Sequence, residues 1–142
     1  MVPFNGPHKF KVDAIGGHEV KISLPYRKKN LNHLKGIHAC ALATLAEVST
    51  GFLLISILNP KKYRLILQRL EMDYHYQAKS AVHAHYKIDE EWLNKEVITQ
   101  LKSDGLAILS PNIMIYDSGG NHVATGTPQW QIKSWEQVKT KV

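Results

Sequence analysis

The chain has 142 residues, of which 44% are hydrophobic and 21% charged, and its net charge is +6. This is the size and composition of one domain with a substantial core, so a disordered protein is excluded and a single domain over residues 1–142 is expected. One cysteine, Cys40, excludes an intrachain disulfide, and the lack of an apolar signal segment at the N-terminus predicts a cytoplasmic protein.

The first clear elements are a strand and a long helix. Val20, Ile22 and Leu24 alternate with polar residues over 18–24, which predicts a half-buried strand. The loop PYRKKNLNHLKG follows at 25–36. Residues 37–58 are almost wholly apolar or small and stop at Asn59-Pro60. That run is too long for a strand and predicts one helix of about five or six turns.

A transmembrane span is the alternative interpretation of this helix, because the length would suffice. Glu47 lies in the middle of it, however, and four hydroxyl residues lie between Thr44 and Ser56. An ionised carboxylate at the centre of a bilayer is costly. We therefore expect a helix buried inside a soluble protein, with no membrane partner.

The rest of the chain is mostly β. Residues 63–76 and 79–88 alternate and are predicted to pair as strands joined at YQAK. A short helix follows, with Asp89 as its cap and Leu93, Val97 and Leu101 along one side. Residues 105–117 and 121–134 predict a hairpin across DSGGN. The expected class is α+β, an antiparallel sheet wrapped around one long central helix.

The centre of the chain carries the spacing N-x-x-x-x-x-H-x-x-x-x-A-T-L-A-E, from Asn32 through His38 to Glu47. With the layout above, this spacing resembles the hotdog-fold thioesterases. The likeness is greatest to the small phenylacetate-pathway type and an uncharacterised branch close to it, and it extends from about His18 to Lys133. It implies a hotdog fold, a homodimer with active sites at its interface, and site residues at Asn32, His38 and Glu47.

The sequence departs from the family pattern at two places. The family has His-Gly-Gly at the helix start, whereas this chain has His38-Ala39-Cys40. Ala39 and Cys40 therefore put side chains where the family leaves room for the thioester. The N–H of Ala39 remains as a donor for an oxyanion. The small hydroxyl residue of the family's next strand falls near Leu65–Leu67, where this chain has no Ser or Thr.

Helix geometry supports a shared site independently. His38 and Glu47 are nine residues apart, so they point from opposite sides of a helix with roughly 13 Å of rise between them. One chain cannot bring both to one reaction centre. Across a two-fold dimer, the helix start of one subunit meets the helix middle of the other.

The resemblance and the chemistry of thioester hydrolysis together suggest roles. A partly buried Glu47 would be the general base, or attack directly to form an anhydride. The Ala39 N–H would hold the oxyanion. Asn32 would orient the water or the carbonyl, and His38 the loop. Thr50, three residues after Glu47, would hold its carboxylate. Cys40 would line the acyl site.

Two basic groups are candidates for binding the substrate's phosphates. One comprises Arg27, Lys28 and Lys29, and the other Lys61, Lys62 and Arg64. They would attract coenzyme A phosphates or an acidic acyl carrier protein, or else be a solvated surface. No nucleic-acid-binding signature accompanies them, so no nucleic-acid partner is expected.

Several structural alternatives remain open at this point. Glu47 would instead be a structural carboxylate paired with Arg64 or Arg69. Cys40 would be a nucleophile or, more often, a small core residue. His83 and His85 share a strand face and would bind Zn²⁺ or belong to a polar outer surface, which we prefer.

We therefore expect a cytoplasmic acyl-thioester hydrolase that acts on acyl-CoA or an acyl carrier without a cofactor or metal, as a homodimer or homotetramer. The alternative is a non-catalytic module that binds acyl-CoA or a related acyl ligand.

Overall fold

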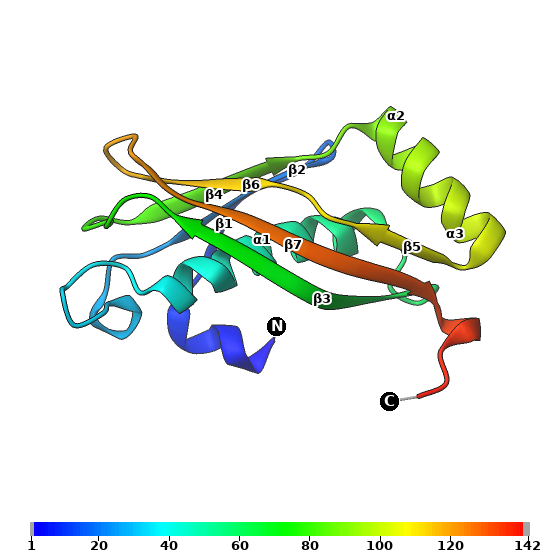
Figure 1. Cartoon of the computed structure of the whole chain (residues 1–142), viewed down its shortest axis with the longest axis horizontal. Helices are drawn as coiled ribbons and strands as arrows, with labels where there is room; N and C mark the ends of the chain where they lie inside the picture. Colours follow the sequence, from blue (N-terminus) through cyan, green and yellow to red (C-terminus); the bar gives the residue numbers. More distant parts are fainter. Residues whose placement is uncertain (1, 141–142) are drawn as a thin grey trace.

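The computed structural model describes residues 2–140 and consists of an antiparallel sheet curled around one long helix, α1 (Ala39–Ile57) (Figure 1). Within these residues the sheet has the order β1-β2-β4-β6-β7-β3, with β5 beside β7. The strands are β1 (Lys11–Gly16), β2 (Glu19–Leu24), β3 (Tyr63–Tyr74), β4 (Val82–Lys87), β5 (Leu106–Leu109), β6 (Ile113–Asp117) and β7 (His122–Ser134). The predicted α+β arrangement is confirmed.

Short helical segments complete the chain. They are η1 (Pro3–His8), η2 (Lys28–Asn30), α2 (Glu90–Leu93), the π-helical turn η3 (Asn94–Ile98), α3 (Thr99–Asp104) and η4 (Trp135–Gln137). The predicted cap of α2 is confirmed, because the Asp89 side chain accepts a hydrogen bond of 2.7 Å from the Trp92 N–H. Leu93, Val97 and Leu101 are buried as expected. This helical segment closes one end of the sheet (Figure 1).

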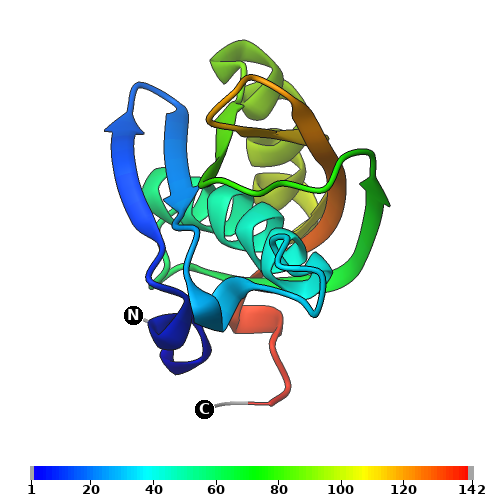
Figure 2. The ribbon, with the colours of Figure 1, turned by 90° about the vertical axis from the view of Figure 1, so that its left-hand side faces the viewer.

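Helix α1 is the centre of the core. Viewed from the end, it lies between β1 and β2 on one flank and β3 on the other (Figure 2). Leu45, Leu53 and Leu54 are fully buried, and each contributes about 1.5–3 kcal/mol by leaving water. By length and composition α1 would suffice to cross a membrane, but 56% of its most apolar window is buried inside the chain. It is the core helix of this fold.

The hydroxyl groups of α1 are satisfied within the helix. Thr44, Ser49 and Thr50 each donate a hydrogen bond to the carbonyl four residues earlier, at 2.7–3.0 Å. Ser56 donates to Leu53 O. Because such bonds remove the cost of burying a hydroxyl, these residues are compatible with a buried helix.

A close contact between helix and sheet joins α1 to β7. The indole Nε1–H of Trp130 donates a 2.9 Å hydrogen bond to the buried Thr50 hydroxyl. A Cβ atom on Gly51 would lie 2.8 Å from the same indole ring. A Cβ atom on Gly126 of β7 would lie 2.7 Å from the Cβ of Ala46. Two glycines, one on each element, therefore permit this approach.

The predicted pairing of residues 63–76 with 79–88 is wrong. β3 pairs with β7 at the sheet edge, whereas β4 pairs with β2 and β6. The segment between them crosses the end of the sheet, where Ala78 O accepts from Ile37 N and Ala81 O from Ser118 N. Strand periodicity identifies a strand but not its neighbour, and this seven-residue link is long enough to pass two strands.

Two further strand predictions need correction. Residues 105–117 form two strands rather than one, because the segment before Ile113 contains Pro111, which has no N–H for a ladder. The sequence does not predict β1, because all the residues of this strand are exposed and its pattern shows no buried face. The final hairpin is confirmed: β6 pairs with β7, and Gly120 supplies a positive φ of 82° in the turn.

The contact at Gly51 yields a stability prediction. Gly51→Ala should lower the free energy of unfolding by about 1–2 kcal/mol, because overpacking against Trp130 exceeds the helix propensity gained from alanine. Urea unfolding monitored by Trp fluorescence would measure this. The matched control is Gly6→Ala, whose added Cβ meets nothing within 4 Å and should change stability by less than about 0.5 kcal/mol. A stabilised Gly51→Ala variant would contradict this account.

Candidate active site

The loop before α1 is held in shape by Asn32. Its side-chain Oδ1 accepts hydrogen bonds from Leu34 N at 2.9 Å and Gly36 N at 3.0 Å. Its backbone N–H donates to Gly36 O at 2.8 Å. The carboxamide oxygen is therefore committed to the loop, and its NH₂ group is the part left for a substrate or water.

Asn30 anchors this loop to the rest of the chain, and the sequence did not suggest it. It is fully buried, and its Nδ2 donates to His8 O and Pro25 O, at 3.0 and 2.9 Å. Its Oδ1 lies 3.1 Å from His8 Nδ1, and its carbonyl accepts from His38 N. A loop asparagine is usually exposed, so no sequence signal marks this position.

His38 is the N-cap of α1. Its backbone is extended, with φ −67° and ψ 139°, and its Nδ1 accepts a 3.0 Å hydrogen bond from Cys40 N. Because Nδ1 is an acceptor, the neutral ring carries its proton on Nε2. This geometry fits the expected role of His38 in orienting the loop.

Ala39 presents an unpaired donor at the start of the helix. It is the first residue of α1 and is exposed. No group of residues 2–140 accepts a hydrogen bond from its N–H, whereas the neighbouring Cys40 N–H is bonded to His38. A free N–H at the positive end of a helix is suited to binding an oxyanion.

Glu47 is the acidic residue of the helix, and it is half-buried. Within residues 2–140 it has no cationic partner: Arg69 pairs with Glu71, and Arg64 donates to Gln131 at 3.2 Å. The predicted alternative of an ion pair with Arg64 or Arg69 is therefore wrong for this chain. Burial raises the pKa of the Glu47 carboxyl, the direction that a general base at neutral pH requires.

The expected contact between Thr50 and the Glu47 carboxylate is wrong. Thr50 is fully buried. Its hydroxyl donates to the Ala46 carbonyl and accepts from Trp130. Residues three apart on a helix can touch, but here the Thr50 side chain faces the sheet and is bonded to Trp130 instead of Glu47. Thr50 therefore anchors the helix.

The open flank of α1 carries Cys40 and Glu47. They are seven residues apart, two turns of helix, and so lie on one face. Cys40 is exposed and its thiol is close enough to Tyr74 of β3 to influence the pKa of that phenol. This face therefore looks toward the β3 edge. Glu47 nevertheless lies about 12 Å along the axis from Ala39, so one chain does not bring the two together.

The two basic groups lie at opposite ends of α1. Arg27, Lys28 and Lys29 are near its start, and Lys61, Lys62 and Arg64 follow its end. The helix has 19 residues and is therefore about 28 Å long. Arg64 is half-buried, and its Nε has no partner within residues 2–140. Within one chain the two groups cannot bind the same phosphate.

His83 and His85 share the outward face of β4, as the burial of Val82 and Ala84 requires. His85 lies 3.2 Å from a Glu19 carboxylate oxygen. His83 lies beside Tyr116. Over residues 2–140, no three His, Cys, Asp or Glu side chains gather in a group that could hold a metal ion.

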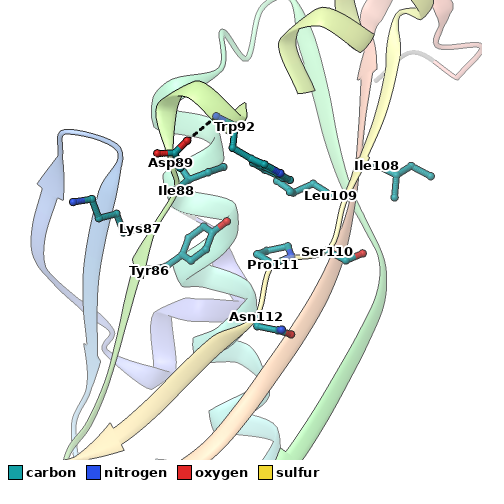
Figure 3. A pocket seen from close by; sticks show the side chains of 10 residues that line it. All are labelled: Tyr86, Lys87, Ile88, Asp89, Trp92, Ile108, Leu109, Ser110, Pro111 and Asn112. Atoms are coloured by element: carbon teal, nitrogen blue, oxygen red, sulfur yellow. Dashed lines mark hydrogen bonds between the residues drawn. The ribbon is translucent and has the colours of Figure 1, made fainter. Parts of the chain in front are cut away.

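Two of the cavities of this chain are described by their lining residues. One of about 260 Å³ is beside α2, lined by Tyr86, Trp92 and Pro111 among others (Figure 3). The other, of about 680 Å³, lies between the N-terminal segment, β1 and α1, with Val48 and Phe52 in its wall. Neither is lined by Ala39 or Glu47. The candidate site therefore lies outside both of these cavities.

The raised pKa of Glu47 predicts a pH-dependent stability. Between its ordinary value of 4.5 and its higher folded value, the folded chain binds more protons than the unfolded chain, so this residue's contribution to stability falls as pH rises. Glu47→Gln removes this loss of stability, because a glutamine side chain does not ionise. At pH 7 the variant should be at least as stable as the wild type, and the difference should shrink toward pH 4.

Urea unfolding at pH 4–8 would measure this difference at matched protein concentration. The control is Glu96→Gln, an exposed carboxylate whose loss should change stability by less than about 0.5 kcal/mol. A Glu47→Gln variant that is destabilised at pH 7 would instead reveal a cationic partner for Glu47.

Comparisons with known proteins place the chain in a family. Residues 1–132 match the family model described as a domain of unknown function, DUF4442. No protein of curated function matches.

Solved structures reveal the fold. A Pseudomonas aeruginosa protein of unknown function, described as a probable thioesterase, is 23% identical with a TM-score of 0.85, over 92% of this chain and 87% of that one. A Haemophilus influenzae thioesterase is 9% identical with a TM-score of 0.73, over 96% and 87%. A Staphylococcus aureus thioesterase is 15% identical with a TM-score of 0.73, over 92% and 98%. The chain therefore belongs to the DUF4442 family of domains of unknown function, and its fold is the hotdog fold of these thioesterases.

Proposed function

We propose that the protein hydrolyses acyl thioesters, such as acyl-CoA, at a site shared between two copies of the chain. The observation that carries this proposal is the pair of unsatisfied groups on one helix. Among residues 2–140, the Ala39 N–H has no acceptor and the half-buried Glu47 has no cation. An oxyanion donor and a base are the two groups that thioester hydrolysis needs.

The dimer that this requires has support at the β3 edge. β3 has 12 residues and pairs only with β7 among residues 2–140, so its other edge is open. A long open edge invites pairing with another chain. Leu65, Leu67 and Leu70 on this strand are half-buried. A second copy related by a two-fold axis at this edge would bring the two α1 helices together in antiparallel orientation.

The same two-fold axis completes both halves of the site. If the start of one α1 lies beside Glu47 of the other, the pair is centred near residue 43 of each helix. The end of the second helix then extends about 15 Å beyond the start of the first, on the side of the loop that precedes it. The Lys61–Arg64 group of the second copy would approach the Arg27–Lys29 group of the first. Together they would attract coenzyme A phosphates or an acidic carrier protein.

The chemistry then follows from ordinary acyl transfer. Water attacks the thioester carbonyl carbon while the Glu47 carboxylate takes one of its protons. The carbonyl oxygen becomes an oxyanion held by the Ala39 N–H. Collapse of the tetrahedral intermediate breaks the C–S bond, and the protonated Glu47 returns its proton to the leaving thiolate. The products are a carboxylic acid and a thiol, and no cofactor is consumed.

Replacing Ala39 by proline tests the oxyanion donor directly. Ala39 is the first helical position, where proline is well tolerated, and the extended backbone of His38 suits a residue before proline. Ala39→Pro should therefore fold but lose about 10²–10³-fold in kcat, the usual cost of one oxyanion donor. Release of free thiol from a panel of acyl-CoA esters would measure it. The control Ala39→Gly keeps the N–H and should remain active.

Glu47→Gln should lower turnover by about 10²–10⁴-fold, the contribution of a general base, and leave the dimer intact. Wild-type protein that binds acyl-CoA esters but hydrolyses none would make the chain the non-catalytic binding module instead.

Mixed dimers test whether the site is shared. Ala39→Pro and Glu47→Gln homodimers, each inactive, are unfolded and refolded together, so that about half the dimers contain one chain of each kind. If donor and base come from different chains, each mixed dimer has one intact site and the pool regains roughly a quarter of wild-type activity. A pool that stays inactive, with exchange verified by mass, would mean that both groups act within one chain.

A further inference from the structure

The sheet has a gap between the end of β4 and the segment that precedes β6. Within residues 2–140, β4 pairs with β6 only over Val82–Ala84. Beyond this point the chain opposite β4 contains Pro111, which has no N–H for a ladder, and the two backbones separate (Figure 3). The cavity of about 260 Å³ lies in this gap, between the end of β4, the start of α2 and residues 108–112.

One nearly buried phenol points into the gap. Tyr86 of β4 is only 7% exposed. Within residues 2–140 its hydroxyl makes no hydrogen bond, unlike three other tyrosine hydroxyls. The oxygen is not enclosed by protein atoms, and it is aimed into the space between Trp92 and Pro111 (Figure 3). Because a buried hydroxyl normally has a partner, the partner of this one has to come from the cavity.

We infer that this gap binds a small uncharged ligand that has one hydrogen-bond acceptor on an apolar body, such as an aryl ketone. The Tyr86 hydroxyl donates to the acceptor, and Trp92 and Pro111 contact the apolar body. A cavity of about 150 Å³ holds benzene, so a cavity of about 260 Å³ accommodates one ring with roughly three further heavy atoms. Neither Ala39 nor Glu47 lines the gap, so this site is separate from the candidate active site.

The charges around the cavity favour an uncharged ligand. Asp89 lines the cavity, and its carboxylate caps α2. Lys87 is the cation among the lining residues, but its side chain points away from the cavity (Figure 3). A ligand carboxylate would therefore lie near Asp89 with no cation to balance it, which is unfavourable. Burial raises the pKa of Tyr86 to about 12, so the phenol is protonated at neutral pH and acts as a donor.

The experiment titrates the full-length protein with three compounds of similar size. Acetophenone is the aryl ketone, α-methylstyrene has a CH₂ group in place of the carbonyl oxygen, and benzoate carries a carboxylate. Binding is followed in ¹H–¹⁵N spectra by the indole N–H signal of Trp92, which Trp92→Phe identifies. The variant is Tyr86→Phe. Its matched control is Tyr63→Phe, because Tyr63 is similarly buried but does not line this cavity.

Acetophenone should shift the Trp92 signal saturably in the wild type, with a dissociation constant at or below about 1 mM. α-Methylstyrene should bind about 3–10-fold more weakly, the loss of one neutral hydrogen bond, and benzoate should not bind. Tyr86→Phe should weaken acetophenone by the same factor and leave α-methylstyrene unchanged, which also verifies that the variant is folded. Tyr63→Phe should match the wild type with all three compounds.

Three outcomes would overturn the inference. Acetophenone that causes no saturable shift in the wild type would mean that water alone satisfies the Tyr86 hydroxyl. Acetophenone and α-methylstyrene that bind equally would reduce the gap to an apolar crevice. Benzoate that binds as tightly as acetophenone would make the ligand an anion. Binding at this gap requires no hydrolase activity, so either proposal can fail without the other.

Discussion

The indole of Trp130 sets the distance between helix and sheet. Its ring lies over Gly51, and its N–H is bonded to the Thr50 hydroxyl. Because the ring contacts the helix backbone and is also held by a buried hydrogen bond, α1 can neither rotate nor slide without breaking one of them. This contact fixes which residues of α1 face the sheet. Glu47 is three residues from Thr50 and four from Gly51, so it lies beside this contact on an adjoining face of the helix, together with Cys40.

The polar side chains of this apolar helix differ in whether they have a hydrogen-bond partner. The hydroxyls of Thr44, Ser49 and Ser56 are satisfied by carbonyls of the helix itself. Glu47 has no such partner among residues 2–140, and its burial raises the pKa of its carboxyl. A buried charged group that lowers stability and makes no stabilising contact is a candidate for a functional role. The contrast within one helix is what distinguishes Glu47 from its polar neighbours.

The loop before the helix likewise contains many hydrogen-bonded polar groups and one unpaired donor. Asn30, Asn32 and the His38 ring satisfy amides and carbonyls around the turn. Their side chains leave the Ala39 N–H without an acceptor among the described residues. The loop is thus rigid around one unpaired donor. Preorganised donors of this kind need no rearrangement when charge develops in a reaction.

The sequence by itself determined the elements whose signal is local. The length and stop of α1, the Asp89 cap and the turn at Gly120 each depend on neighbours within a few residues. The lone carboxylate in an apolar helix was also visible there. The resemblance added the hotdog fold and the Asn-His-Glu spacing. All of these depend on spacing along one chain, which a sequence records.

Only the tertiary structure decided the pairing of β3 and β4, the anchoring role of Thr50 and the positions of Asn30 and Tyr74. Strand periodicity gives a buried face but not a neighbour, so β3 lies at the edge for reasons that the strand itself does not contain. Thr50 faces Trp130 because a contact 80 residues away in sequence sets the rotation of the helix. Tyr74 reaches Ala39 across 35 residues. These contacts arise from packing between distant segments, where no local pattern in the sequence specifies the partner.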